Sequence, residues 1–212
     1  MARNINKAIM AIKIGMTQIF DETGTSIPVT ILQSDTCTVV QRKRKETDSY
    51  NAIQLGMHPR KEKQVNRPMK GHFKKANVKP LKYIKEVRVE NVEDYEVGQE
   101  IKVDVFAPGD WVDVVGTSKG RGFAGGIKRH NFSRGNMTHG SKHHRRTGSL
   151  AAKGPARVFK GRKMPGRLGG DRVTVQGLRI ASIYPDQNII LVKGAVPGPK
   201  RGLVIIKDSV KA

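Results

Sequence analysis

Three glycines, Gly120, Gly122 and Gly125, form the pattern G-x-G-x-x-G, which is typical of loops that bind dinucleotide phosphates. The pattern follows the strand-like run WVDVVG at 111–116, where such a loop is expected. A dinucleotide site also needs a helix after the glycines and an acidic residue about 20 positions further on for the ribose. The next carboxylate is Asp171, and the residues before it are rich in Gly, Arg and His. The glycines therefore do not predict a nucleotide cofactor.

A metal site is suggested by His139, His143 and His144, because the first two are spaced i, i+4. Lys142 and two arginines beside them are positive and oppose a dication, and no cysteine or carboxylate is near enough to complete a ligand set. Ser, His and Asp residues form no pattern that resembles a nucleophile elbow or a paired-carboxylate site. We expect no metal, no cofactor, no small-molecule substrate and no enzymatic activity.

The glycines and histidines belong to a segment that contains no acid. Residues 114–170 hold fourteen Lys or Arg, four of the six histidines and thirteen glycines, in a chain of 212 residues with a net charge of +22. This concentration of positive charge predicts a polyanionic partner. Arg and Lys neutralise phosphates, Arg stacks on exposed bases, and glycine lets a backbone approach RNA closely. We therefore predict that the segment lies against RNA.

The predicted RNA contacts are the basic side chains and histidines of residues 117–170, which we call the basic segment. They are Lys119, Arg121, Lys128, Arg129, His130, Arg134, His139, Lys142, His143, His144, Arg145, Arg146, Lys153, Arg157, Lys160, Arg162, Lys163 and Arg167. The glycines predicted to permit close approach are Gly120, Gly122, Gly125, Gly126, Gly135 and Gly140.

Two other functions would use the same charge. A nonspecific DNA-compacting protein has basic arms that stay disordered until bound. Such an arm belongs at a terminus, whereas the basic segment has strand-like sequence on both sides. An RNA-modifying enzyme with a basic substrate channel would need a catalytic constellation, and the sequence shows none.

The regions on both sides of the basic segment predict β structure. Short runs with β-branched residues recur, among them IPVTIL, TCTVVQ, WVDVVG, NIILVKG and LVIIK. DETG at 21–24 and PDQN at 185–188 predict hairpin connections, with Gly24 suited to a positive φ. Many short strands without alternating long helices predict a mainly β fold, either an antiparallel barrel or a sandwich. The basic segment interrupts this domain, so its ends near Gly116 and Asp171 are expected to be adjacent.

A second basic insertion covers about residues 57–82. PMKGHFKKA within it predicts a short helix opened by Pro68. We favour a surface loop with a strand and a turn here over a dedicated binding site. Cys37 is the single cysteine and is expected to be a small core residue on a strand. The longest apolar runs are far shorter than the roughly 18 residues of a spanning helix, so we expect no membrane partner.

Four blocks carry a resemblance to a known family. They are KIGMTQIFDETGTSIPVTIL at 13–32, GTSKGRGFAGGIKRHNFSRGNMTHGSKHHRRTGS at 116–149, RVFKGRKMPGRLGGDRVTVQ at 157–176 and ILVKGAVPGPKRGLVII at 190–206. In this order they resemble the bacterial uL3 family of large-subunit ribosomal proteins. Many bacterial relatives have a glutamine, methylated in some, in the loop after GS, and residues 148–161 contain no glutamine.

The resemblance implies a β-barrel of the translation-protein type, formed by residues 1–116 and 171–212. It also implies that residues 117–170 form a long glycine-rich extension that binds large-subunit (23S-type) ribosomal RNA and threads toward the peptidyl transferase centre. The implied function is that of a structural component that binds the RNA early in subunit assembly. Its partners would be the ribosomal RNA and neighbouring large-subunit proteins, and its place the cytoplasm, in the ribosome.

Overall fold

The computed structural model describes residues 7–211. Its strands are β1 Ala8–Phe20, β2 Ser26–Gln33, β3 Cys37–Lys43, β4 Ala52–Pro59, β5 Leu81–Val87, β6 Glu100–Ile101, β7 Trp111–Thr117, β8 Phe123–Ala124, β9 Gly166–Arg167, β10 Arg172–Tyr184, β11 Ile189–Lys193 and β12 Leu203–Asp208. Its α-helices are α1 Lys45–Asp48, α2 Arg67–Lys75 and α3 Gly126–His130. Short 3-10 helices cover Glu62–Gln64, Val103–Val105 and Pro185–Gln187.

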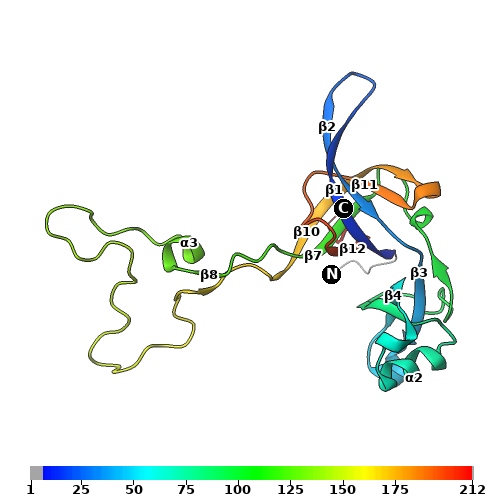
Figure 1. Cartoon of the computed structure of the whole chain (residues 1–212), viewed down its shortest axis with the longest axis horizontal. Coiled ribbons are helices and arrows are strands. Elements are labelled where there is room, and N and C mark those ends of the chain that lie inside the picture. Colours follow the sequence, from blue (N-terminus) through cyan, green and yellow to red (C-terminus); the bar gives the residue numbers. More distant parts are fainter. Residues whose placement is uncertain (1–6, 212) are drawn as a thin grey trace. The chain divides into compact units, whose positions relative to one another are not determined.

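Six strands close into a barrel in the order β1-β12-β7-β10-β11-β2 (Figure 1). Every pairing around the barrel is antiparallel. β12 lies between β1 and β7, so a strand late in the chain joins one from its beginning to one from its middle. The prediction of a mainly β fold with an antiparallel barrel is confirmed, and the closed sheet decides between barrel and sandwich.

The barrel interior is filled by aliphatic side chains that alternate along the strands. Val112 and Val114 on β7 and Ile190 and Val192 on β11 belong to the core cluster, and each pair points to one face because every second residue of a strand does so. The same hydrophobic cluster continues into a second sheet through side chains such as Leu55. One core therefore supports both sheets.

The second sheet has the order β5-β4-β3-β6 and is antiparallel throughout. α2 belongs to the insertion at 57–82, and it begins after Asn66, whose side chain accepts the amide of Met69. Pro68 lies in the first turn of α2, as predicted, and Phe73 is its buried residue. Cys37 opens β3 inside the core, and burial raises the pKa of its thiol to about 11, which confirms the expectation of a core residue.

Both predicted hairpin connections are present. β1 and β2 are joined by a turn that contains Gly24 at φ +79°, and β10 and β11 are joined by the short helix at Pro185–Gln187. β1 pairs with β12 from Ala8 to Ile12 and with β2 from Ile12 to Phe20. Its second half therefore pairs with β2 and not with β12, and it extends beyond the barrel (Figure 1). This part of the chain is the β1–β2 hairpin, residues 14–30.

The described residues form two compact units. One holds the barrel and the second sheet and comprises the residues up to Thr117 and from Arg172 onward, and the other is Ser118–Asp171. Thr117 pairs with Arg172 across β7 and β10, and Gly116 pairs with Val173. The prediction that the chain leaves and re-enters the β domain at adjacent positions is confirmed by this register.

A buried carboxylate supports the irregular part of β10. Asp113 on β7 is fully buried, and its Oδ1 accepts the amide of Gly177 at 3.0 Å. Gly177 has φ +66° and lies where the pairing of β10 with β7 shifts register between Val175 and Leu178. Within residues 7–211 the other oxygen, Oδ2, accepts no hydrogen bond. Asp113 therefore holds the bulge through one hydrogen bond. Burial of its second oxygen without a partner lowers the stability of the fold.

We expect Asp113→Ala to lower the free energy of unfolding by about 0.5–1.5 kcal/mol, because the Gly177 amide at the bulge loses its acceptor. Asp113→Asn keeps an oxygen acceptor and should cost less. Urea unfolding followed by circular dichroism measures both, with Asp186→Ala, on an exposed turn, as the control. Equal stability of the Ala variant and the native chain would contradict this role.

Candidate nucleic-acid interface

The unit Ser118–Asp171 begins and ends in a short two-stranded ladder. The Ser118 amide donates to the Asp171 carbonyl at 2.9 Å, and the Arg121 amide donates to the Leu168 carbonyl at 2.8 Å. β8 and β9 continue the ladder through the pairs Phe123–Arg167 and Ala124–Gly166. The first and last residues of the unit are therefore paired with each other, next to the positions where the chain leaves and re-enters the β domain.

The short helix α3 fastens the next part of the unit. Arg129 Nη1 donates to the carbonyl of Met164 at 2.7 Å, and His130 Nε2 lies 2.9 Å from the same oxygen. Gly126 is buried against the ring of Phe132, and a Cβ at Gly126 would lie 2.8 Å from that ring. The unit therefore has a small packed centre, built around α3.

Residues 133–163 contain no helix or strand (Figure 1). A few hydrogen bonds and one contact between a cation and a ring join different parts of this stretch. The Gly135 amide donates to the His144 carbonyl at 3.0 Å, and Arg162 Nη2 donates to the Ser149 carbonyl at 2.7 Å. Arg157 lies over the ring of Phe159, 5.6 Å from its centroid. Most backbone groups of this part are left for solvent or a partner.

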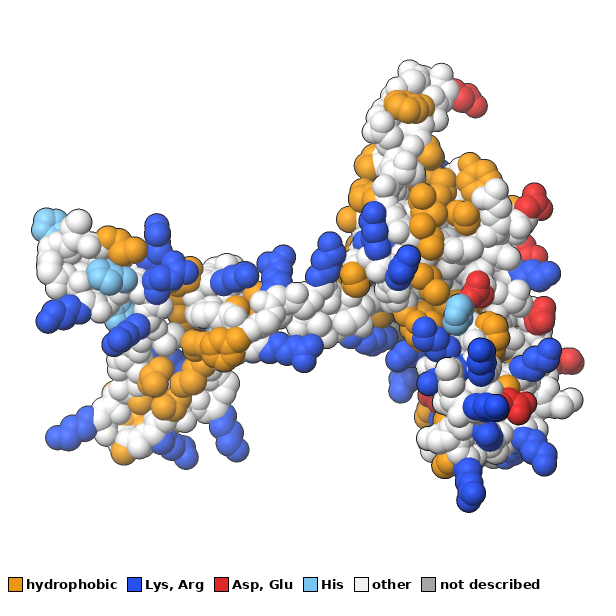
Figure 2. All heavy atoms as spheres, viewed as in Figure 1, with side chains coloured by type: hydrophobic (Ala, Val, Ile, Leu, Met, Phe, Trp, Pro, Cys, Tyr) orange, Lys and Arg blue, Asp and Glu red, His pale blue; other side chains and the backbone are white. Residues whose placement is uncertain are grey.

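Fifteen of the eighteen predicted contact side chains are exposed, and Arg129, His130 and His144 are half-buried. Figure 2 shows Lys, Arg and His side chains along this unit. Within residues 7–211 none of its fourteen Lys and Arg side chains forms an ion pair. Its positive charge is thus available to a partner, except that Arg129 and Arg162 also bind carbonyls of the unit itself.

The six predicted glycines fall into three groups. At Gly126 and Gly135 a Cβ would meet the chain itself, the ring of Phe132 in one case and the His143 carbonyl in the other. Gly122 and Gly140 have φ of +67° and +72°, which favours glycine. Gly120 and Gly125 have open space and no positive φ, so nothing in the isolated chain requires glycine there.

Sequence reasoning missed the part played by Met164 and Gly169. The Met164 carbonyl binds two side chains of α3, and a Cβ at Gly169 would meet the Lys119 carbonyl across the ladder. The G-G pair at 169–170 is a signal for such a tight approach, whereas nothing in the sequence marks the Met164 carbonyl.

Amide exchange is expected to follow these contacts in the isolated protein. Amides in 133–163 should exchange much faster than those of β7 and β10, because this part lacks regular backbone pairing. Amides of Arg121 and Leu168 should be slower, since each donates across the ladder. Hydrogen exchange with mass spectrometry measures both regions, and protection of 133–163 equal to that of the barrel strands would contradict the expectation.

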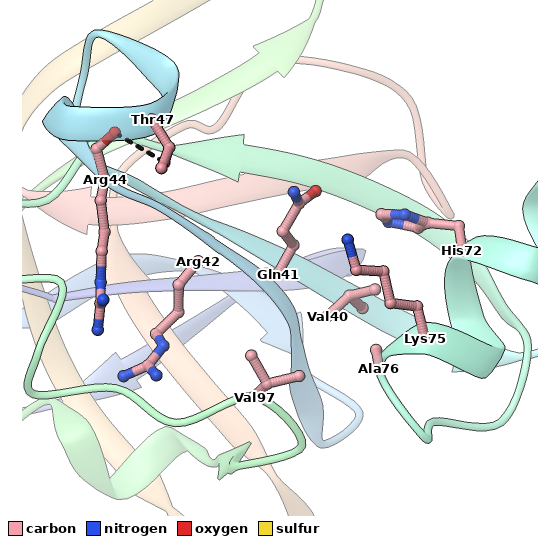
Figure 3. A pocket seen from close by; sticks show the side chains of 9 residues that line it. All are labelled: Val40, Gln41, Arg42, Arg44, Thr47, His72, Lys75, Ala76 and Val97. Atoms are coloured by element: carbon pink, nitrogen blue, oxygen red, sulfur yellow. Dashed lines mark hydrogen bonds between the residues drawn. The ribbon is translucent and has the colours of Figure 1, made fainter.

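A second group of cations lines a pocket on the β domain. Residues of β3, α1 and α2 form most of its wall (Figure 3). Arg42, Arg44, His72 and Lys75 line it, and no carboxylate or cysteine does. Arg44 pairs with Glu93 at 2.9 Å, His72 Nε2 bonds Gln54, and the Thr47 hydroxyl bonds the Arg44 carbonyl. The lining thus offers positive charge but no nucleophile and base in contact.

No helix in 7–211 is long and apolar enough to cross a membrane. No three His, Cys, Asp or Glu side chains in that range lie where they could hold a metal ion.

Comparisons with known proteins agree with one another. A family model described as Ribosomal protein L3 matches residues 33–187. The large ribosomal subunit protein uL3 of Syntrophomonas wolfei subsp. wolfei is 68% identical over 205 residues, which cover 97% of each chain. The uL3 proteins of Pelotomaculum thermopropionicum and Carboxydothermus hydrogenoformans are 63% and 60% identical, each over 97% of this chain and 98% of the relative.

Proposed function

Because the chain belongs to the ribosomal protein L3 family, and is thus a structural protein of the large ribosomal subunit and not an enzyme, we propose that its basic segment binds large-subunit ribosomal RNA directly. The single observation that carries this proposal is the set of exposed cations in the unit Ser118–Asp171, of which none is ion-paired within the described residues. A surface of unpaired cations gains affinity for phosphates by releasing counterions.

Exposed apolar side chains in the same unit support contact with RNA bases. Phe123 is 81% exposed, and Met137 and Phe159 are also exposed. Aromatic rings that face solvent are suited to stack on unpaired bases. The contact of Arg157 with Phe159 adds a cation beside one such ring. The segment thus offers both charge for the backbone and flat surfaces for bases.

Two finer proposals rest on membership of the family. We propose that the protein joins the large-subunit RNA early in assembly, and that the basic segment extends toward the peptidyl transferase centre. The length of the segment is compatible with a long reach, since about 28 residues in each direction at ~3.3 Å per residue span up to roughly 90 Å.

Nonspecific compaction of nucleic acid is the competing function for a chain with this charge. It differs from the proposal in one physical respect, because a cationic arm needs charge alone, whereas RNA of a fixed shape also requires space for close approach. Gly120 and Gly125 separate the two functions, since nothing in the isolated chain requires glycine there.

Gly120→Val is expected to weaken binding to folded large-subunit RNA by about tenfold or more, because it preserves every charge and adds volume where the backbone meets RNA. The matched control is Gly15→Val on β1, where a Cβ would meet only Lys200 Cε at 3.9 Å. Filter binding at fixed salt gives both affinities. Equal affinity of Gly120→Val and the native chain would favour a nonspecific arm.

A further inference from the structure

The β1–β2 hairpin carries no positive side chain of its own. Residues 14–41 contain no Lys or Arg, although the chain carries 40 of them. Asp21 and Glu22 lie at the tip of the hairpin. Figure 2 shows the hairpin as apolar and uncharged side chains with an acidic one at its end. Without cations of its own, the hairpin cannot gain affinity for phosphates by releasing counterions, so RNA is a poor partner for it.

The hairpin also has an open backbone edge. β12 pairs with β1 only as far as Ile12, and β2 occupies the opposite edge of β1 from there to Phe20. The edge between Ile14 and Phe20 therefore has no neighbouring strand among the described residues. Its sequence, IGMTQIF, has no charge and no proline, two of the devices that keep an edge strand from pairing, although the register shifts at its start between Lys13 and Gly15.

Large apolar side chains on the hairpin face solvent. Phe20 is 65% exposed and Met16 is 54% exposed, and the register places both on one face together with Pro28. Ile19 and Ile27 pair on the other face, beside a groove of about 740 Å³ that Pro108 and Ala181 also line and that Arg179 and Lys193 border with positive charge. Apolar side chains that gather on one exposed face are typical of protein contact sites.

Hydrogen bonds within the turn favour the ionised form of the acidic tip. Asp21 Oδ1 accepts the Thr23 hydroxyl at 2.6 Å, the Thr23 amide at 3.0 Å and the Thr25 amide at 2.8 Å. These bonds, chiefly that of the Thr23 hydroxyl, hold the pKa of Asp21 below its ordinary value. Glu22 beside it forms no ion pair within residues 7–211. The tip therefore complements a positively charged partner.

We propose that the β1–β2 hairpin is a docking arm for a second protein, a basic neighbour in the large subunit that lays an extended segment along the open edge of β1 from Ile14 to Phe20. The apolar face and the edge amides bind that segment, and the acidic tip meets its cations. The inference rests on the proposed function only in placing the protein in the ribosomal subunit. It assigns to the hairpin a partner of a different class from that of the basic segment.

Site-specific cross-linking in purified large subunits tests the inference. A benzophenone side chain replaces Phe20 in one variant and Phe123 in another, both in the full-length protein. Both positions are exposed, so the replacement leaves the core intact. We expect irradiation to join the Phe20 variant to a basic protein, and the Phe123 variant to ribosomal RNA. An RNA adduct at position 20, or no adduct there, would overturn the docking arm.

A second variant tests the edge itself. Met16→Lys places a charge on the apolar face beside the open edge and should reduce the protein adduct at position 20 severalfold. Thr47→Lys, on the short helix α1, is the control and should leave the yield unchanged. An undiminished yield with Met16→Lys would refute pairing along this edge. Failure of the proposed function would show separately, as a missing RNA adduct at position 123.

Discussion

Deletion of residues 125–160, with a short glycine-rich turn in their place, is expected to leave the barrel folded and to reduce the affinity for large-subunit RNA at least about a hundredfold. The deletion removes nine of the fourteen Lys and Arg side chains of the basic segment. The barrel should persist because Thr117 and Arg172 pair directly across β7 and β10, so the two ends are already adjacent without the deleted residues.

Circular dichroism and thermal unfolding report on the barrel of the deletion variant, and filter binding reports on the RNA. Asp113 and the bulge at Gly177 lie outside the deleted residues, so the unfolding transition of the β domain should remain cooperative. A deletion variant that is unfolded would show that the basic segment contributes to the core. A folded variant with native affinity would place the RNA contact elsewhere on the chain.

Replacement of Arg145 and Arg146 by glutamine is expected to make RNA binding both weaker and less dependent on salt. Each phosphate contact contributes roughly 0.7–0.9 to the slope of log affinity against log salt, so two lost contacts should lower that slope by about 1.4–1.8. Both side chains are exposed, and neither forms an ion pair in the described residues, so their whole charge is available to phosphates.

The matched control is the pair Arg42→Gln and Arg44→Gln. These arginines share the carboxylate of Glu93, at 4.0 and 2.9 Å, so less of their charge is free for RNA. Binding curves at several salt concentrations should give a nearly native slope for this control. If both double variants lose slope equally, the polyanion contact is spread over the whole surface rather than concentrated in the basic segment.

The sequence predicts the β domain well where the signals are local. Hairpin turns at Gly24 and at 185–188 and runs of β-branched residues on β7 and β11 depend on neighbours in the chain, and the structure has them. The division into a barrel and a second sheet is not predictable in this way. It depends on pairs such as Cys37 with Ile101, which are remote in sequence and leave no periodic signal.

The basic segment shows the same limit at the level of single side chains. Composition identifies its cations, but it cannot distinguish those that face solvent from Arg129, which turns to the Met164 carbonyl because α3 directs it there. The glycines likewise look equivalent in the sequence. Only the fold shows that Gly135 is needed beside His143, whereas Gly120 has open space. The outcome of substitutions at these positions therefore depends on geometry that composition does not contain.

The position of β12 between β1 and β7 bears on the order of events during synthesis of the chain. A nascent chain that ends before Leu203 has β1 and β7 but lacks the strand that joins them, so the barrel remains open along that seam. Because contacts remote in sequence form late, closure follows the emergence of nearly the whole polypeptide. By then the basic segment, between β7 and β10, has already been synthesised, although the barrel that holds its two ends is not yet closed.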